Sequence, residues 1–198
     1  NSGILSEKIY YQPQNNPGQF YKPNQKLSRG HHSTQELLRQ MITESDNDAM
    51  DALEQIRLPE IVQMYKELQI PSPIAAPNDF MSARDYSRVF RILYNSSYLP
   101  RSASEQALQL LTQTKFNKGL TKKIDPKVPV AHKFGEHSLE QGGKIIEREL
   151  HDCGIIYHPK QPYLLCVMTK GQDFSKLEVI ISNISKIVFD EIENSSKI

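Results

Sequence analysis

The chain has 198 residues, of which 38% are hydrophobic and 24% charged, and its formal net charge is +1. This length suffices for one domain with a substantial core, and the composition is ordinary for a soluble globular protein. A charge so close to zero argues against a broad nucleic-acid-binding surface. The sequence also lacks an apolar run of the roughly 20 residues that a transmembrane helix requires.

The N-terminal half is expected to be mainly helical after a polar connecting segment. Residues 1–30 are rich in turn residues, with a short strand predicted over 8–11. Ser33 and Glu36 form a capping-box pattern that predicts the start of a helix. A second helix is expected to begin near Asp46, and a third to carry Pro59 in its first turn.

Further elements follow in the order helix, helix, three strands, helix. Residues 71–78 predict a loop, after which Ser82 is expected to cap one helix and Ser102 or Ser104 to open the next. Strands are predicted over 130–135, 153–157 and 163–169, and a final helix over 174–192. The predicted fold class is therefore α+β: a helical cluster plus an antiparallel sheet with a C-terminal helix packed on it.

We expect one domain over 1–198, incomplete on its N-terminal side. It divides into the connecting segment 1–30, the mainly helical part 31–128, and the strands and last helix in 129–198. The domain is judged incomplete because a three-stranded sheet with one helix on a face is marginal cover for a core of this size.

The two cysteines, Cys153 and Cys166, fall on neighbouring predicted strands. A disulfide is compatible with this spacing, but two buried free thiols are the favoured interpretation. The six histidines show no ligand spacing with either cysteine, so no zinc site, other metal or cofactor is predicted.

The tripeptide Ser45-Asp46-Asn47 lies at the junction of two predicted helices. A hydroxyl and an amide can each donate and accept hydrogen bonds without a net charge, which suits proton relay and substrate binding. The competing interpretation is a simple helix N-cap, for which Ser, Asp and Asn are all favoured.

A second tripeptide, Lys133-Phe134-Gly135, lies on a predicted strand and is followed by Glu136. On its own it is equally compatible with an exposed lysine followed by a turn glycine.

Read together and in this order, the two tripeptides resemble the second and third signatures of the penicillin-recognising serine hydrolases, the β-lactamases and penicillin-binding proteins. The run 34–38 resembles the helix that leads into the first of these two signatures in class A β-lactamases. Residues 77–79 resemble the end of their Ω loop, and the closing strand-strand-strand-helix order is also similar.

This resemblance implies a β-lactamase/transpeptidase-like fold, an extracytoplasmic location and roles for five residues. Ser45 would pass a proton toward the leaving group, and Lys133 would supply positive charge, so these two are the candidate catalytic residues. Asn47, Gly135 and Glu136 would bind substrate, the last through its backbone N–H as an oxyanion donor.

Three departures from the family pattern qualify the expected activity. No serine is followed by lysine at the third position, so the S-x-x-K nucleophile is missing; it would lie upstream, with two further strands. Phe134 replaces a hydroxyl residue that would contact the substrate carboxylate. The stretch between Asn47 and Asp79 offers no E-x-x-x-N, the glutamate of which activates the deacylating water in class A enzymes.

The expected function is hydrolysis or acyl transfer on β-lactams or D-alanyl stem peptides through an acyl-enzyme. The missing N-terminal segment, as a separate chain, is a possible partner, and no nucleic-acid partner is expected. The alternative is a non-catalytic relative that binds a cell-wall peptide or a β-lactam.

Overall fold

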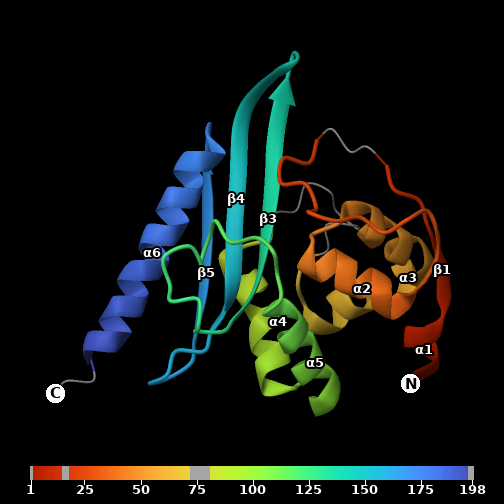
Figure 1. Ribbon diagram of the computed structural model, residues 1–198, viewed down its shortest axis with the longest axis horizontal. Coiled ribbons are helices and arrows are strands. Elements are labelled where there is room, and N and C mark those ends of the chain that lie inside the picture. Colours follow the sequence, from red (N-terminus) through yellow and green to blue (C-terminus); the bar gives the residue numbers. More distant parts are fainter. Residues whose placement is uncertain (1, 15–17, 72–80, 196–198) are drawn as a thin grey trace. The chain divides into compact units, whose positions relative to one another are not determined.

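The computed structural model describes residues 2–14, 18–71 and 81–195 (Figure 1). The chain forms two compact units, Asn1–Asp85 and Tyr86–Ile198, and each is described here by itself. The predicted loop over 71–78 and the Ω-loop-like residues 77–79 lie almost wholly outside the described residues. The architecture is α+β, as expected from the sequence. Within the described ranges, no helix is long and apolar enough to cross a membrane.

The first unit joins a small two-stranded sheet to helices. Its elements are α1 (Ser2–Ser6), β1 (Lys8–Tyr11), β2 (Gly30–Ser33), α2 (Thr34–Thr43) and α3 (Asn47–Leu68). The predicted strand over 8–11 is confirmed, and it pairs antiparallel with β2, which was not predicted. Alternate residues of β1 are buried, and they join a core with residues of α2 and α3: Ile9, Tyr11, Leu37, Ala49 and Leu53.

The start of α2 follows the predicted capping box. Ser33 Oγ accepts a hydrogen bond from the Glu36 amide at 3.2 Å, and Glu36 Oε2 accepts from the Ser33 amide at 2.7 Å. Each bond satisfies a backbone donor that a helix N-terminus leaves without an intrahelical partner.

α3 consists of two helical segments that meet at a kink, so the second and third predicted helices are both present. Arg57 has non-helical backbone angles (φ −116°, ψ 16°) two residues before Pro59. The helical segment after the kink carries Pro59 in its first turn, as predicted, where the amide donor that proline lacks has no intrahelical partner to lose.

The second unit begins in α4 and contains a three-stranded antiparallel sheet. Its elements are α4 (Ala83–Asn95), α5 (Arg101–Leu111), β3 (Val130–Gln141), β4 (Lys144–Ile156), β5 (Tyr163–Gly171) and α6 (Phe174–Ser195). The predicted cap of α4 is confirmed, because Ser82 Oγ accepts from the Asp85 amide at 3.2 Å. The prediction that Ser102 or Ser104 opens α5 is wrong: Pro100 is the N-cap, and Ser104 is buried inside the helix.

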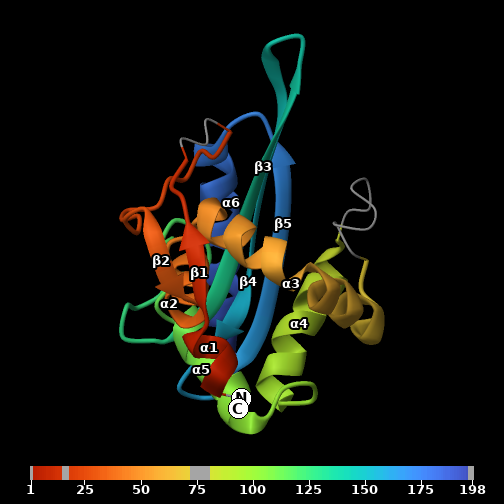
Figure 2. The same ribbon diagram turned by 90° about the vertical axis from the view of Figure 1, so that its right-hand side faces the viewer.

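Strands β3 and β4 are longer than the sequence predicted. They continue as a hairpin that extends beyond β5, as Figures 1 and 2 show, and close through Gly142 and Gly143. Both glycines have positive φ (60° and 73°), as a two-residue hairpin turn of the favoured hand requires. Much of the hairpin's outer part, 136–149, is polar and exposed, so it carries no apolar alternation that would have predicted a strand.

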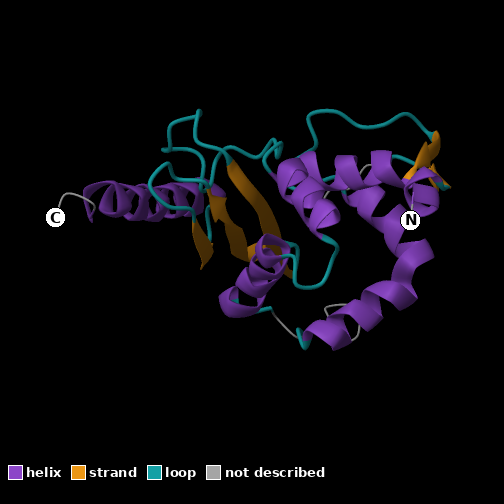
Figure 3. Cartoon of the chain, turned by 90° about the horizontal axis from the view of Figure 1, so that it is seen from below, coloured by secondary structure: helices purple, strands orange, loops and turns teal. Residues whose placement is uncertain are grey.

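Residue alternation divides the sheet into two faces. Val130 and Ile156 lie on the face that packs against α6 through Phe189. Ile155 and Leu164 lie on the opposite face, near Tyr94 of α4. The last helix thus packs along one face of the sheet, as predicted (Figures 1 and 3).

The favoured interpretation of the two cysteines is wrong. Cys153 and Cys166 form a disulfide, and neither is free. They are direct cross-strand partners on β4 and β5, with Cα atoms 4.0 Å apart. The pairing depends on the register of the two strands, which the spacing of the cysteines in the sequence does not specify.

Candidate active site

The first group of candidate residues lies where α2 passes into α3. Ser45 is half-buried in the connection and has a positive φ of 55°. Its carbonyl oxygen accepts a hydrogen bond from Gln19 Nε2 at 2.8 Å. A left-handed backbone costs a non-glycine residue about 1 kcal/mol or more, and it persists only where the surroundings fix it. The position of Ser45 is therefore imposed by its neighbours.

Asp46 is the neighbour that fixes this junction. Its side chain is 1% exposed, and Oδ1 caps α3 by accepting from the amides of Asp48 (2.9 Å) and Ala49 (3.4 Å). Oδ2 accepts from Tyr11 Oη at 2.8 Å and from Gln40 Nε2 at 3.1 Å. Four donors around one buried carboxylate satisfy its charge and hold the chain on either side of it.

Tyr11 acts as a permanent donor to this carboxylate. Burial, together with the hydrogen bond to Asp46 and its charge, raises the pKa of the phenol above its ordinary value of 10. The hydroxyl therefore remains protonated across the physiological range and keeps its proton on the Asp46 side.

Asn47 is the first residue of α3 and is half-buried. The next residue, Asp48, holds the preceding loop to the helix: its Oδ2 accepts from Lys26 Nζ at 2.6 Å and from the Gln14 amide at 2.9 Å. Lys26 Nζ also donates to the Gln14 carbonyl at 2.8 Å. The loop on the N-terminal side of β2 is thus tied to the start of the helix that carries Asn47.

The second group lies on β3. Lys133 is half-buried; its Nζ donates to the Phe134 carbonyl at 3.1 Å and lies 4.6 Å from the centroid of the Phe134 ring. Its own carbonyl accepts from Tyr86 Oη of α4 at 2.9 Å. Burial lowers the pKa of Lys133 to about 8, an effect that the charges of Asp152 and Glu136 partly offset. The ammonium is therefore largely protonated at neutral pH but close to its titration range.

Phe134, which replaces the hydroxyl residue of the family pattern, is a core residue. Its side chain is 6% exposed and stacks on Phe116, with ring centroids 4.0 Å apart and planes at 19°. Because neighbouring strand residues face opposite sides, Phe134 lies on the α6 face, whereas the Lys133 and Gly135 positions lie on the other. An added Cβ at Gly135 would have no described atom within 4 Å, so packing among the described residues does not require a glycine here. Glu136 follows, half-buried.

The structure brings the predicted residues together within two groups. Ser45 and Asn47 flank Asp46 in the first unit, and Lys133, Gly135 and Glu136 are consecutive or nearly so on β3 of the second. That the two groups face a common cleft stays a prediction.

Sequence reasoning missed several residues that hold these groups in place. Gln40 is a polar residue on the buried face of α2, and that mismatch was the available signal. Asp152 precedes the strand predicted over 153–157, but it lies inside β4, which begins at Lys144, and it is fully buried. It contacts His132 on β3, a pairing that requires the strand register.

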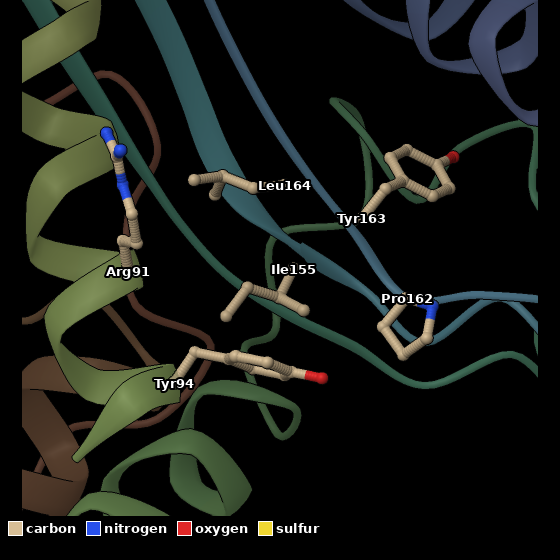
Figure 4. A pocket seen from close by; sticks show the side chains of 6 residues that line it. All are labelled: Arg91, Tyr94, Ile155, Pro162, Tyr163 and Leu164. Carbon is tan, nitrogen blue, oxygen red and sulfur yellow. The ribbon is translucent and has the colours of Figure 1, made fainter.

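An apolar hollow of about 150 Å³ lies beside the sheet of the second unit, and none of the candidate residues lines it (Figure 4). Its lining comes from α4, from β4, from β5 and from the residue just before β5: Arg91, Tyr94, Ile155, Pro162, Tyr163 and Leu164. In the described part of the chain, no three His, Cys, Asp or Glu side chains are grouped so that they could hold a metal ion.

Comparison with known proteins identifies the family. The family Beta-lactamase2, described as the beta-lactamase enzyme family, matches residues 4–192. The chain belongs to this family. Comparison with curated proteins gives no match.

Solved structures share the β-lactamase-like fold at low sequence identity. PBP-A is 18% identical, with a TM-score of 0.73 over 96% of this chain and 72% of its own. The extended-spectrum β-lactamase TLA-3 is 19% identical, with a TM-score of 0.76 over 95% and 76%. A β-lactamase from Chitinophaga pinensis is 18% identical, with a TM-score of 0.74 over the same shares. The predicted family and fold class are confirmed.

Proposed function

We propose that the chain supplies the substrate-binding wall of a serine hydrolase or acyl-transferase that acts on β-lactams or D-alanyl cell-wall peptides. The observation that carries this proposal is the junction at Ser45, where a strained backbone is fixed by a buried carboxylate. A simple N-cap does not require a left-handed serine in front of it, since Asp46 alone caps α3.

Each candidate residue has a chemical role in this proposal. Ser45 relays a proton toward the leaving-group nitrogen, and Asn47 holds the substrate's side-chain carbonyl through its amide. Lys133 places positive charge beside the substrate carboxylate, and Gly135 leaves space for substrate backbone. The Glu136 amide stabilises the oxyanion, for which a backbone N–H needs no reorganisation during the reaction.

The nucleophilic serine is absent from this chain, since no S-x-x-K occurs in it. We propose that it comes from polypeptide outside these residues, either upstream in a longer protein or as a separate chain. Because such substrates belong to the cell wall, we propose that the protein lies outside the cytoplasm. A variant of PBP-A has been solved as an acyl-enzyme complex with penicillin G, which makes penicillin a reasonable first probe.

The test is the intact mass of the protein isolated from its natural source, before and after incubation with benzylpenicillin. The expected result is a mass above 22.7 kDa that rises by one penicillin. A mass equal to that of this chain, with no adduct, would overturn the acyl-enzyme proposal. In the adduct-forming protein, Lys133→Ala should slow acylation about 100-fold, whereas Lys127→Ala, which removes an exposed lysine just before β3, should not.

The second candidate function is binding without turnover, and the missing S-x-x-K motivates it. Calorimetric titration of the 198-residue chain with a D-alanyl-D-alanine peptide distinguishes it: saturable heat with no covalent mass change supports a binding relative. Absence of heat, together with an adduct in the natural protein, leaves the hydrolase or acyl-transferase as the function.

A further inference from the structure

The outer part of the β3–β4 hairpin is a ribbon of two strands. In the described residues, β5 pairs with β4 only as far as Arg148, whereas the hairpin continues to its turn (Figures 1 and 2). Two strands by themselves are only marginally stable in water. The ribbon also carries three large apolar side chains that are 42–48% exposed: Leu139, Ile145 and Ile146. Both features point to a further surface that packs on this ribbon.

The two edges of the ribbon differ in regularity. The register shifts between Leu139, which faces Glu147, and Glu140, which faces Ile145. Ile146 is therefore an extra residue on β4, and a bulge of this kind protects a strand edge against further pairing. β3 has no extra residue here and, in the described part of the chain, pairs only with β4. The outer edge of β3 is thus the edge that another strand can join.

The open part of this edge lies toward the hairpin turn. Nearer the core, the His132 carbonyl accepts from the Thr114 hydroxyl at 2.8 Å, and the Lys133 carbonyl accepts from Tyr86 Oη at 2.9 Å. Residues 137–141 lie beyond these contacts and contain neither lysine nor proline, which natural proteins place on edges to prevent pairing. This segment is therefore available to a second strand.

Charge selects one register for two copies of this segment that pair antiparallel about a two-fold axis. Directly facing residues in such a pair have the same hydrogen-bonding orientation, so the axis passes through a residue and not between two. An axis at Ser138 would set Glu136 against Glu140 of the second copy. An axis at Glu140 would set that carboxylate against its own copy. Like charges that face each other directly destabilise a sheet, which disfavours both registers.

An axis at Leu139 brings no like charges together. It sets the exposed Leu139 against its own copy and His137 against Gln141 of the second copy. Ser138 then faces Glu140, whose carboxylate can accept a hydrogen bond from the hydroxyl. Each facing pair in this register is thus apolar or polar and complementary.

We propose that two copies of this chain form a dimer by antiparallel pairing of residues 137–141 of β3 about a two-fold axis at Leu139. The sheet of one copy continues into the sheet of the other. Such a short segment buries less surface than the interfaces of stable dimers, so the association is reversible and needs a high protein concentration. The dimer does not depend on the proposed hydrolase or acyl-transferase activity.

The test is disulfide trapping of single-cysteine variants of the 198-residue chain, in which the two natural cysteines are already paired with each other. With oxidised glutathione, Leu139→Cys should form a covalent dimer at least about 10-fold faster than Gln141→Cys. The reason is distance: facing Cβ atoms lie about 5 Å apart, whereas the two copies of position 141 would lie about 14 Å apart. A mixture of His137→Cys and Gln141→Cys should form a mixed dimer faster than either variant dimerises alone, because these positions face each other.

Equal rates for Leu139→Cys and Gln141→Cys would overturn the proposal. Sedimentation equilibrium supplies a second measurement without a cross-link, and a wild-type chain that stays monomeric at millimolar concentration would also overturn it. Leu139→Lys sets two ammonium groups against each other and should abolish the dimer, whereas Ile146→Lys, on the bulged strand, is the matched control and should retain it. An equal loss in both variants would show unspecific apolar contact and overturn the register. The readouts need no substrate, so their failure is distinct from failure of the penicillin test.

Discussion

Asp46 shows how one residue can fix the conformation of a candidate site. Its four hydrogen bonds join β1, α2 and the start of α3, so Ser45 and Asn47 are held from both sides. The tyrosine that reaches it from β1 is the longest-range of these partners, 35 residues away in sequence.

Removal of that hydroxyl should therefore destabilise the fold. Tyr11→Phe leaves a buried carboxylate oxygen with one donor fewer, and the free energy of unfolding should fall by about 1–3 kcal/mol. The adjacent Tyr10→Phe is the control: its exposed hydroxyl accepts a hydrogen bond from Arg29 Nε, and its loss should cost less than about 0.5 kcal/mol. Urea denaturation measures both, and equal losses would contradict the proposed role of the buried bond.

Lys133 makes stability depend on pH in a defined direction. Its folded-state pKa of about 8 lies below the ordinary value of 10.5, so the unfolded chain binds a proton more readily. Burial of the protonated amine therefore lowers the free energy of unfolding by its full amount below pH 8. This cost falls as the pH rises toward 10.5. Relative to Lys133→Met, the wild-type protein should gain on the order of 1–2 kcal/mol across this interval, after allowance for solvent screening.

The measurement is chemical denaturation of both proteins at several pH values, with Lys127→Met as an exposed-lysine control. A difference between wild type and Lys133→Met that stays constant from pH 7 to 10 would show that the lysine is solvated like any surface amine.

At the scale of elements, the disulfide closes the turn between β4 and β5. The two cysteines are 13 residues apart, and a cross-link over a loop of this length stabilises by about 3 kcal/mol in the chain-entropy description. Reduction with dithiothreitol should lower the urea midpoint of the wild-type protein accordingly. The double variant Cys153→Ala/Cys166→Ala should start at the lower midpoint and show no further response to the reductant.

Thiol titration of the unfolded protein without reductant is the direct check. Two reactive thiols per chain would mean that the cysteines are not paired in solution.

Sequence patterns predicted the elements that depend on local chemistry and missed those that depend on long-range register. The capping pattern at Ser33 and the short strand predicted over 8–11 concern local structure, and both were confirmed. The hairpin over 136–149 was missed because exposed strands carry no apolar pattern, although the Gly142-Gly143 pair was an available turn signal.

The same distinction between local chemistry and long-range register applies to the residues of the candidate site. Its motif residues could be named from the sequence because their types and order are distinctive. The residues that support them could not, because Tyr11 reaches Asp46 across 35 positions and His132 meets Asp152 only in one register of β3 and β4. Such contacts are properties of the assembled fold and not of any segment of it.

At the scale of the whole sheet, β5 is the strand whose pairing remains to be tested. In the described residues β4 is paired on both sides, whereas β3 and β5 are each paired only with β4. An open strand edge exposes a row of backbone donors and acceptors, which natural proteins usually cover. That the sheet is larger in a longer form of the protein stays a prediction.

Native-state hydrogen exchange of the 198-residue chain tests this directly. Amides throughout β4 should exchange slowly, whereas on β5 only the amides that face β4 should be protected, giving an alternating pattern. Protection of every β5 amide at micromolar concentration would show that another segment already pairs with this edge. If the alternating pattern is seen here and becomes continuous in a longer form of the protein, the added residues supply the neighbouring strand, and the same preparation then provides the material for the penicillin test.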